Sequence, residues 1–403
     1  MKVLKSFFLT ILILLTIGAF KTDAIPAFAR KYRISCLTCH APSTPKLKAY
    51  GDDFAGDGFR LEDYEAPRYY VETGDEKLSL IRDFPLAVRM DGFVKYNFAA
   101  KDKTDFSAPY LVKLLSGGDL SENISYYFYF YMDERREVAG VEDAYLMYNN
   151  AFGQDLDIYL GQFQVSDPLF KRELRMSLED YRVYTAQIGM SQASLKYDKG
   201  VMITYGLPTS TDIIFEVVNG NGLPEADRFH VFDKDKYKSF VGRISQDVGD
   251  FLRVGFFGYY GKEDMTNADI LNSTTITNEV MFLGPDLTLT FGDKIEINGQ
   301  YMRRTDDQVY TNPGSTVALE DIQTDGVLGE IIYSPNGDDS DWYALGMYNF
   351  VESDFSPADY QSATFHFGYM FRRNIRLAAE YTQVFTNPDD AFGQVSFGFV
   401  SAF

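Results

Sequence analysis

The sequence predicts an all-β fold, a transmembrane antiparallel β-barrel of about 16 strands preceded by a short segment of different character. Three observations predict it. From Pro85 onward, one alternating apolar–polar segment follows another. Aromatic residues make up 16% of the chain, with 29 Tyr and 34 Phe, which is more than an acidic soluble protein needs. After the first residues no apolar run is long enough for a membrane helix, so strands would have to cross the membrane.

The first residues read as a secretory signal peptide, residues 1–24. Lys2 and Lys5 precede an almost wholly apolar run, and small residues allow cleavage after Ala24 or after Ala29. We therefore expect an exported protein, located in the bacterial outer membrane if the barrel prediction holds. The formal net charge of −20 argues against a nucleic-acid partner.

A short motif follows the signal: Cys36-Leu37-Thr38-Cys39-His40. The chain has 2 Cys, both here, and only 3 His, so a chance match is less probable than in a Cys-rich chain. This spacing is the attachment signature of a c-type haem. Each thiol adds to one haem vinyl group, and the adjacent histidine reaches the iron. We therefore expect one covalent haem c bound by Cys36, Cys39 and His40, with His40 as the metal ligand, and we assign no catalytic residue.

Two other interpretations of the motif stand beside this one. A zinc site would need more ligands, and the chain holds no second Cys/His pair. A disulfide or redox Cys-x-x-Cys is compatible with export but does not explain His40.

Residues 25–83 form the haem segment and a polar linker, too small to hold a core without the haem. We expect a helix over 47–54, ended by the turn at 56–58. The stretch 25–32, the Cys-x-x-Cys-His motif and the stretch 45–51 together resemble a group of exported bacterial monohaem cytochromes. The aromatic residues expected to pack on the porphyrin are Tyr32, Tyr50, Phe54 and Phe59.

The alternating segments justify the barrel, which we expect over residues 84–403. In the segment 86–98 one face is almost wholly apolar, whereas the other carries Arg89, Asp91 and Lys95. Apolar-out and polar-in alternation with a period of two is typical of a transmembrane barrel strand. Further segments of this kind are 156–161, 295–301, 363–371, 376–381 and 395–403. The segment 125–132 adds an aromatic strand, with Tyr and Phe on one side and Tyr on the other, and tyrosines near strand ends suit the interfacial girdle.

Short turns rich in Asn, Asp and Gly separate these segments and join antiparallel neighbours. Examples are Asn149-Asn150, 247–250, Asn336-Gly337 and Arg373-Asn374. A soluble β-sandwich also has alternating strands, but here the apolar face continues over too many strands. The chain also resembles outer-membrane barrels in ending on an aromatic residue, Phe403. An even strand number returns both chain ends to one face, so we expect the N-terminal segment on the periplasmic side.

The region after residue 160 interrupts the alternation. Residues 169–180 are crowded with charges, and their apolar residues have the spacing of a helix face. The order of a Gly-x-Phe strand at 161–163, this charged insert, an Asp-x-Gly strand at 198–200 and an Asn-Gly turn at 219–222 resembles the phosphate-selective porin group. The resemblance covers most of the barrel. It implies a water-filled lumen with a loop folded inward and is compatible with a homotrimer.

Three cations of the insert, Lys171, Arg172 and Arg175, have two interpretations. They form a basic constriction inside the barrel, or they solvate a surface helix and pair at helical spacing. Because the chain is strongly acidic, unlike a group that selects anions through lumenal cations, we do not predict phosphate selectivity.

The sixth iron ligand stays open. No methionine lies between His40 and Met90, so the usual sequence-near methionine ligand is missing. Alternation places His366 in the lumen, His230 falls in a loop, and Met176 lies in the insert. These side chains, a Tyr or Lys of the haem segment, and water are the candidates.

Two functions of different classes follow from these patterns. The first is electron transfer at the periplasmic face, with a periplasmic or multihaem cytochrome as partner, since one haem does not bridge an apolar band of about 25 Å. The second is a solute porin in which the haem segment is a plug or structural element. An enzyme such as a peroxidase would need a distal His–Arg arrangement that is not visible, so an electron carrier or porin is favoured over an enzyme.

Overall fold

The structure is a computed structural model of the 403-residue chain, and it describes residues 27–61, 74, 77–78, 84–100, 103–134, 140–267, 273–386 and 391–403. The predicted signal peptide and most of the predicted linker lie outside the described residues. The described α-helices are α2 (Ala27–Tyr32) and α3 (Ala49–Gly56). The strands are β1 (Leu86–Asn97), β2 (Thr104–Asp119), β3 (Ile124–Glu134), β4 (Gly140–Tyr148), β5 (Leu156–Gln164), β6 (Tyr197–Leu207), β7 (Thr211–Val218), β8 (Ser239–Val248), β9 (Leu252–Thr266), β10 (Thr275–Phe291), β11 (Ile295–Tyr310), β12 (Ala318–Tyr333), β13 (Trp342–Ser353), β14 (Tyr360–Arg372), β15 (Ile375–Val384) and β16 (Phe392–Ala402).

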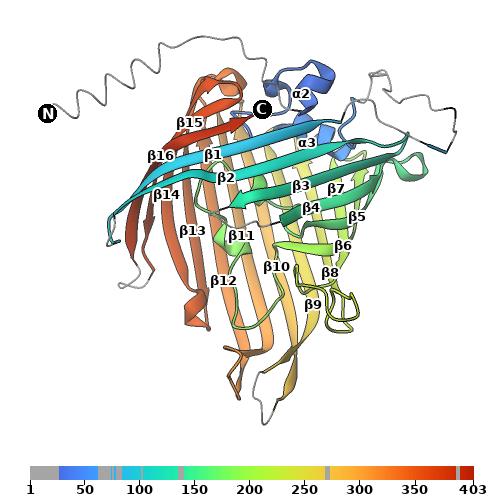
Figure 1. Cartoon of the computed structure of the whole chain (residues 1–403), viewed down its shortest axis with the longest axis vertical. Coiled ribbons are helices and arrows are strands. Elements are labelled where there is room, and N and C mark those ends of the chain that lie inside the picture. Colours follow the sequence, from blue (N-terminus) through green and yellow to red (C-terminus); the bar gives the residue numbers. More distant parts are fainter. Residues whose placement is uncertain are drawn as a thin grey trace.

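These sixteen strands form one closed antiparallel barrel (Figure 1). Each strand pairs with its neighbours in sequence, and β1 pairs with β16 from Arg89↔Ala402 to Asn97↔Gln394, which closes the ring. A closed ring has no edge strand, so the main-chain groups of the wall are paired without water. The predicted antiparallel barrel of about 16 strands is confirmed.

The wall alternates as the sequence predicts. Along β10, Met281, Leu283 and Leu287 point outward and are exposed, whereas Val280 and Phe282 point inward and are buried. An apolar outer surface of this kind is stable only against lipid, which matches a membrane-spanning barrel. None of the described helices is long and apolar enough to cross a membrane.

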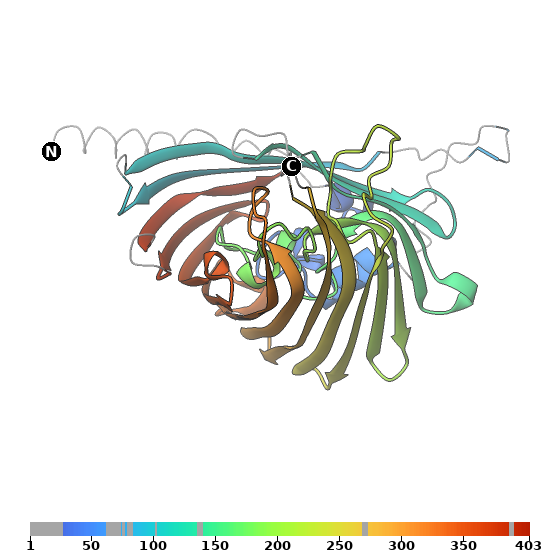
Figure 2. The same ribbon diagram turned by 90° about the horizontal axis from the view of Figure 1, so that it is seen from below.

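The lumen differs from the water-filled interior that the resemblance implied. Inward side chains near the middle of the wall are buried; among them are Val241, Phe257, Val280, Met302, Leu328, Tyr343 and Leu345. They pack against the segment 165–196, which connects β5 to β6 and lies inside the ring of strands (Figure 2). We call this segment the insert. The interior is therefore packed at this height.

The insert corrects one prediction. Residues 169–180 do not form a helix; the regular structure there is one 3₁₀ turn, Arg172–Leu174. The reason is that main-chain N–H groups of the insert donate to side chains of the barrel wall rather than to carbonyls one helical turn earlier. The N–H groups of Leu178 and Glu179 both donate to the carboxylate of Glu380.

The two ends of the barrel differ. At one end, hairpin turns of two to eight residues join β2 to β3, β4 to β5 and so on, and the turn predictions at Asn149-Asn150, 247–250 and Arg373-Asn374 are confirmed. Asn336-Gly337 does join two strands, but inside an eight-residue connection with a 3₁₀ turn at Gly337–Asp339 rather than in a two-residue hairpin. The other end carries the longer connections, including the insert and a 20-residue loop between β7 and β8.

The N-terminal segment lies at the short-turn end, beside the C-terminus (Figure 1). The helix predicted over 47–54 is α3, which begins at Ala49 and ends at Gly56. In outer-membrane barrels the short turns face the periplasm and the longer loops face outward. The segment therefore lies on the side that the sequence predicted.

Candidate functional site

The Cys-x-x-Cys-His motif is wound into one tight turn. Cys36–Thr38 form a 3₁₀ helix, and the side chain of Ser35 accepts a hydrogen bond from the N–H of Leu37 at its start. The N–H of His40 donates to the carbonyl of Cys36 at 2.9 Å. Two thiols and an imidazole are thus gathered within a single turn of backbone.

The His40 ring has one defined orientation. Its Nδ1 lies 3.0 Å from the carbonyl oxygen of Lys46 and 3.2 Å from that of Pro45. A carbonyl only accepts, so Nδ1 carries the proton, and Nε2 of the neutral ring keeps its lone pair. Burial also lowers the pKa of His40, which favours this neutral form. A carbonyl-bound Nδ1–H with a free Nε2 is the usual arrangement of a metal-ligating histidine.

The two cysteines are free thiols in the structure. Burial raises the pKa of both Cys36 and Cys39, so both are protonated at neutral pH. Within the described residues, no three His, Cys, Asp or Glu side chains are placed to hold a metal ion. A bare zinc ion would therefore lack ligands here, whereas a haem brings four nitrogens of its own. The residues present fit a c-type haem.

Helix α3 and the residue that precedes it pack against the Cys-x-x-Cys-His motif. The N–H of Lys48 donates to the carbonyl of Cys39 at 3.0 Å. Gly51 permits this approach, because a Cβ at that position would lie 2.2 Å from the same carbonyl oxygen. Phe54 on the next turn of α3 is buried against Phe28 and Phe59, with ring centroids 5.4 and 5.9 Å away.

The four aromatic residues predicted to pack on a porphyrin have different surroundings in the structure. Phe54 and Phe59 form the segment's own small core, and the hydroxyl of Tyr32 donates to the carbonyl of Phe59 at 2.6 Å. Tyr50 alone among the four predicted residues has a largely exposed side chain. Two of the four aromatic side chains therefore stabilise the segment rather than offer a free face.

The segment is fastened to the rim of the barrel at several points. Phe59 stacks on the lumenal Tyr127 of β3, with ring centroids 5.2 Å apart, and the Asn149 amide donates to the carbonyl of Gly56 at 3.1 Å. Three ion pairs join it to three different hairpins: Lys31–Asp119 at 2.6 Å, Lys46–Glu296 at 2.7 Å and Lys48–Asp338 at 2.7 Å. The cations are on the segment and the carboxylates on the barrel.

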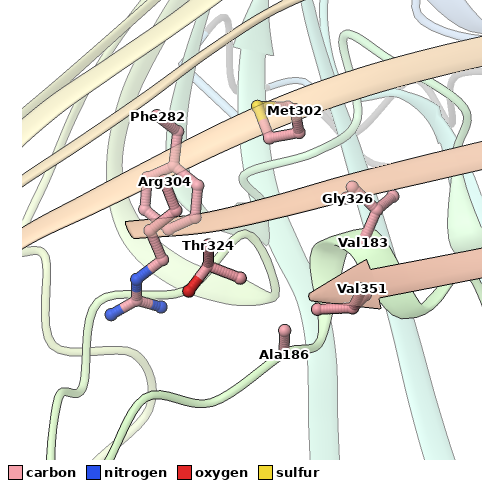
Figure 3. A pocket seen from close by; sticks show the side chains of 8 residues that line it. All are labelled: Val183, Ala186, Phe282, Met302, Arg304, Thr324, Gly326 and Val351. Carbon is pink, nitrogen blue, oxygen red and sulfur yellow. The ribbon is translucent and has the colours of Figure 1, made fainter. Parts of the chain in front are cut away.

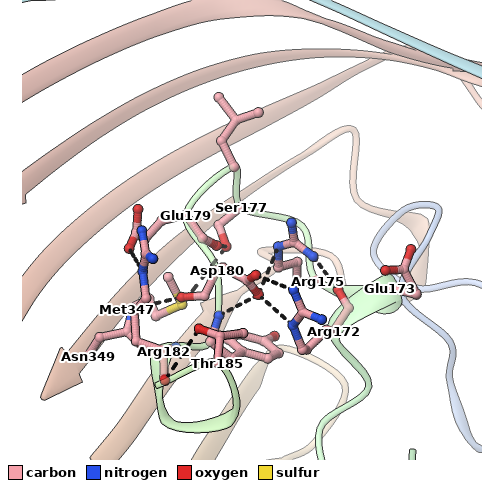
Figure 4. Close-up of polar contacts among 12 residues, drawn as sticks. Arg172, Glu173, Arg175, Ser177, Glu179, Asp180, Arg182, Thr185, Met347 and Asn349 are labelled. Carbon is pink, nitrogen blue, oxygen red and sulfur yellow. Dashed lines mark hydrogen bonds and ion pairs between the residues drawn. The ribbon is translucent and has the colours of Figure 1, made fainter. Parts of the chain in front are cut away.

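The three cations of the predicted constriction do lie in the insert, inside the barrel; Arg172 and Arg175 are drawn in Figure 4. Lys171 pairs with Asp167 at 2.7 Å, and the guanidinium of Arg172 binds Asp180, with Nε 3.0 Å from Oδ1. Arg175 lies 3.8 Å from the same carboxylate. Each cation is balanced by a neighbouring carboxylate, so neither the free basic ring nor the surface helix is found.

Two anchors hold the insert to the wall. On one side, Glu380 accepts from the N–H groups of Leu178 and Glu179. Beside it, Asn349 accepts from the N–H of Arg182 at 3.0 Å (Figure 4). These wall residues carry no sequence motif. Their only signal is that they are polar residues at inward positions of otherwise regular strands.

On the other side, Arg304 of β11 is buried and donates to Ser191 at 2.7 Å and to the carbonyl of Ala193 at 3.1 Å. Its charge is met by Asp306, 2.6 Å from Nε. Arg304 also lines a cavity of about 10 Å³ with Val183 of the insert (Figure 3). That volume is about one water molecule, so the cavity does not hold a solute.

The structure places the candidates for the sixth iron ligand in different parts of the molecule. His366 faces the lumen as predicted, but both nitrogens are engaged, Nδ1 with Glu380 at 2.8 Å and Nε2 with the Tyr343 hydroxyl at 3.0 Å. His230 is exposed in the loop between β7 and β8, at the end of the barrel opposite His40. Met176 is buried in the insert. The geometry thus removes His366 and His230 as ligands of a haem in the same chain.

Comparison with known proteins concerns the barrel. Neither a family model nor a curated protein sequence matches the chain. Solved structures do match. The trimer form of OmpT from Vibrio cholerae has a TM-score of 0.54 and 15% identity over 80% of this chain and 99% of its own. An anion-selective porin from Comamonas acidovorans has a TM-score of 0.53 and 11% identity over 80% and 99%. Salmonella typhi OmpF, in complex with daunomycin, has a TM-score of 0.55 and 12% identity over 79% and 97%.

These likenesses show the fold: the chain is a porin-like barrel of the bacterial outer membrane. The apolar outer surface of the closed wall agrees with that location.

Proposed function

We propose that this porin-type barrel carries one covalent c-type haem at its periplasmic mouth, attached to Cys36 and Cys39 and ligated by His40, and that it takes part in electron transfer there. The observation that carries the proposal is the orientation of His40, whose Nε2 is left free by the two carbonyls at Nδ1. When bound, the haem supplies a one-electron Fe(II)/Fe(III) couple.

The chain's own residues have three tasks in this proposal. Ser35 and the 3₁₀ turn hold the thiols beside the imidazole. The carbonyls of Pro45 and Lys46 fix the ring and its tautomer. The rim ion pairs keep the segment at the mouth. A periplasmic or multihaem cytochrome is the proposed partner, because one haem does not bridge an apolar band of about 25 Å.

A solute porin is the second candidate, and the fold neighbours favour it more directly than they favour electron transfer. In it the N-terminal segment is a plug or structural element, and a homotrimer, as in the trimer form of OmpT, is the proposed assembly. The packed middle of the lumen weighs against a wide permanent channel, since the insert would have to move before a solute passes.

One pair of measurements separates the two. The full chain is expressed with a c-type haem maturation system and extracted from the membrane. We expect a reducible c-type spectrum, a polypeptide mass that includes the haem after denaturation, and electron exchange with a soluble c-type cytochrome. A Cys36→Ser/Cys39→Ser variant should lose the haem and keep the barrel.

His40→Asn should change the ligand-dependent bands, whereas the matched control His230→Asn should leave them unaltered. Planar-bilayer recordings complete the test. A colourless protein of unmodified mass with large open-channel steps would leave only the solute porin.

A further inference from the structure

The loop 219–238, between β7 and β8, is not used by the proposed function. It begins where β7 ends and closes where β8 begins, at the pair Val218↔Ser239. Figure 1 shows that the loop lies beside β9 at the long-loop end of the barrel. Several of its large apolar side chains are exposed: Leu223, Phe229, Val231 and Phe232, with Phe229 at 67%.

The wall around this loop marks the edge of the membrane. Phe240 and Tyr260 are opposite each other on β8 and β9, and both are exposed on the outer face. At the next outward-facing position toward the long-loop end, the outer face becomes charged: Lys262 of β9 pairs with Glu279 of β10 at 2.8 Å. Aromatic residues below charged residues are the pattern of the interfacial girdle. The loop therefore leaves the wall at the level of the outer-leaflet headgroups.

Two aspartates of the loop, Asp227 and Asp235, accept hydrogen bonds from main-chain N–H groups. Asp227 accepts from the N–H groups of Phe229 and Val231 at 2.8 and 3.0 Å. Asp235 accepts from Tyr237 at 2.7 Å and from Asp264 of β9 at 3.1 Å. These bonds make the aspartates structural and order the loop.

Three cations of the loop differ from these aspartates, because they have no carboxylate partner among the described residues. Arg228, Lys234 and Lys236 are exposed. Among the described residues no carboxylate pairs with any of them; the recorded contacts are cation–π, Arg228 over Phe229 and Lys236 over Tyr237 at 4.6 and 5.0 Å. Exposed cations beside exposed aromatic side chains at a membrane boundary suit an anionic headgroup above an acyl chain.

We propose that the loop 219–238 binds the phosphate-bearing headgroups of outer-leaflet lipid. Arg228, Lys234 and Lys236 pair with lipid phosphates, while Phe229, Val231 and Phe232 enter the acyl boundary. The proposal is independent of the haem, because the loop is at the opposite end of the barrel from His40.

The test uses the full chain in a non-ionic detergent and native mass spectrometry, with lipid A as the probe and phosphatidylcholine as the uncharged reference. The wild type should retain lipid A preferentially. Arg228→Gln/Lys236→Gln should lower the apparent lipid A affinity roughly 25-fold, since each lost surface cation costs about a factor of five. The matched control is Lys294→Gln/Arg372→Gln, two exposed cations at the short-turn end, which should bind as the wild type does.

Two further measurements identify the source of the phosphate. A Phe229→Ser/Phe232→Ser variant should also lose lipid A, and soluble glucosamine phosphate should not displace it at equal concentration. Unchanged lipid A binding by Arg228→Gln/Lys236→Gln, with β-structure retained by circular dichroism, would overturn the proposal. Displacement by the soluble phosphate as effective as by lipid would overturn it too.

Discussion

Two regions close the barrel, and they are held in different ways. The insert, 165–196, is held inside the lumen by buried groups such as Glu380 and Arg304. The N-terminal segment, 27–61, is held at the rim by ion pairs whose side chains keep part of their exposure, up to 44% at Asp338. The insert is therefore part of the barrel core, whereas the segment is a docked module with a small core of its own.

The difference has an energetic consequence. Removing one partner of a buried charge pair leaves the other charge uncompensated in a medium that solvates it poorly, which costs several kcal/mol. An exposed pair loses little, because water and salt already screen it. Changes to the insert should therefore affect global stability, and changes to the rim should affect the segment alone.

The largest effect is expected at Arg304. Replacing it by Met leaves the buried Asp306 unpaired and should lower the free energy of unfolding by about 3–5 kcal/mol. Denaturant unfolding in micelles measures this. The neighbouring Arg303 is the matched control, since it points outward and its pair with Asp325 is partly exposed. Arg303→Met should cost less than about 1 kcal/mol. Equal losses in the free energy of unfolding for the two variants would mean that burial of the ion pair does not determine the cost of removing its arginine.

The next effect concerns the core of the segment. Phe59 is buried between Phe28 and Tyr127, with ring centroids 4.7 and 5.2 Å away. Phe59→Ala should lower the local stability of residues 27–61 by about 3 kcal/mol, because a buried aromatic ring leaves a cavity. Amide hydrogen exchange reports it. Tyr50→Ala, at an exposed ring on the same segment, is the control, and the amides of the insert should stay protected in both variants.

The rim ion pairs should each contribute less. Lys31→Gln or Lys48→Gln should weaken the docking of the N-terminal segment by about 1 kcal/mol or less. Replacing all three rim lysines together should weaken docking by the sum of the single losses. Exchange at the segment should also become faster as salt is raised, while exchange at the insert does not change. A salt response of the insert equal to that of the segment would remove the distinction between core and module.

The smallest effect is the response to pH in the haem-free chain. Burial lowers the pKa of His40 in the folded segment, so the unfolded segment binds more protons below its own pKa of about 6.5. The stability of the segment is therefore complete above that pH and falls as the pH drops below it. Protection factors at residues 27–61, which correct for the slower base-catalysed exchange at lower pH, should therefore fall as the pH is lowered from 7.5 to 5.5, conditions we choose to bracket roughly pH 6.5. In His40→Asn they should not.

The wall could be predicted in detail, and its contents could not. The alternation at 363–371 placed His366 in the lumen correctly, because a side chain's face depends only on its position within its own strand. The helix expected over 169–180 was wrong. Its backbone donors at Leu178 and Glu179 bond to Glu380, about 200 residues away in sequence, and spacing within the insert contains no trace of that partner.

The candidate site shows the same division. Cys36, Cys39 and His40 are recognisable as the candidate haem site from five consecutive residues, since the spacing of a Cys-x-x-Cys-His motif is local. The expectation that Phe54 and Phe59 face a porphyrin did not foresee that they pack on each other and on Tyr127. The rim partners Asp119, Glu296 and Asp338 had no signal beyond the acidity of the turns.

By itself the sequence determined that the chain forms a membrane-crossing wall of alternating strands and carries a thiol–thiol–imidazole motif near its start. Both are properties of neighbouring residues. Only the tertiary structure decided that the lumen is filled and that the motif is seated on the short-turn rim. Those outcomes depend on side chains such as Arg304, Glu380 and Lys46, which meet their partners only after the strands have closed into a ring.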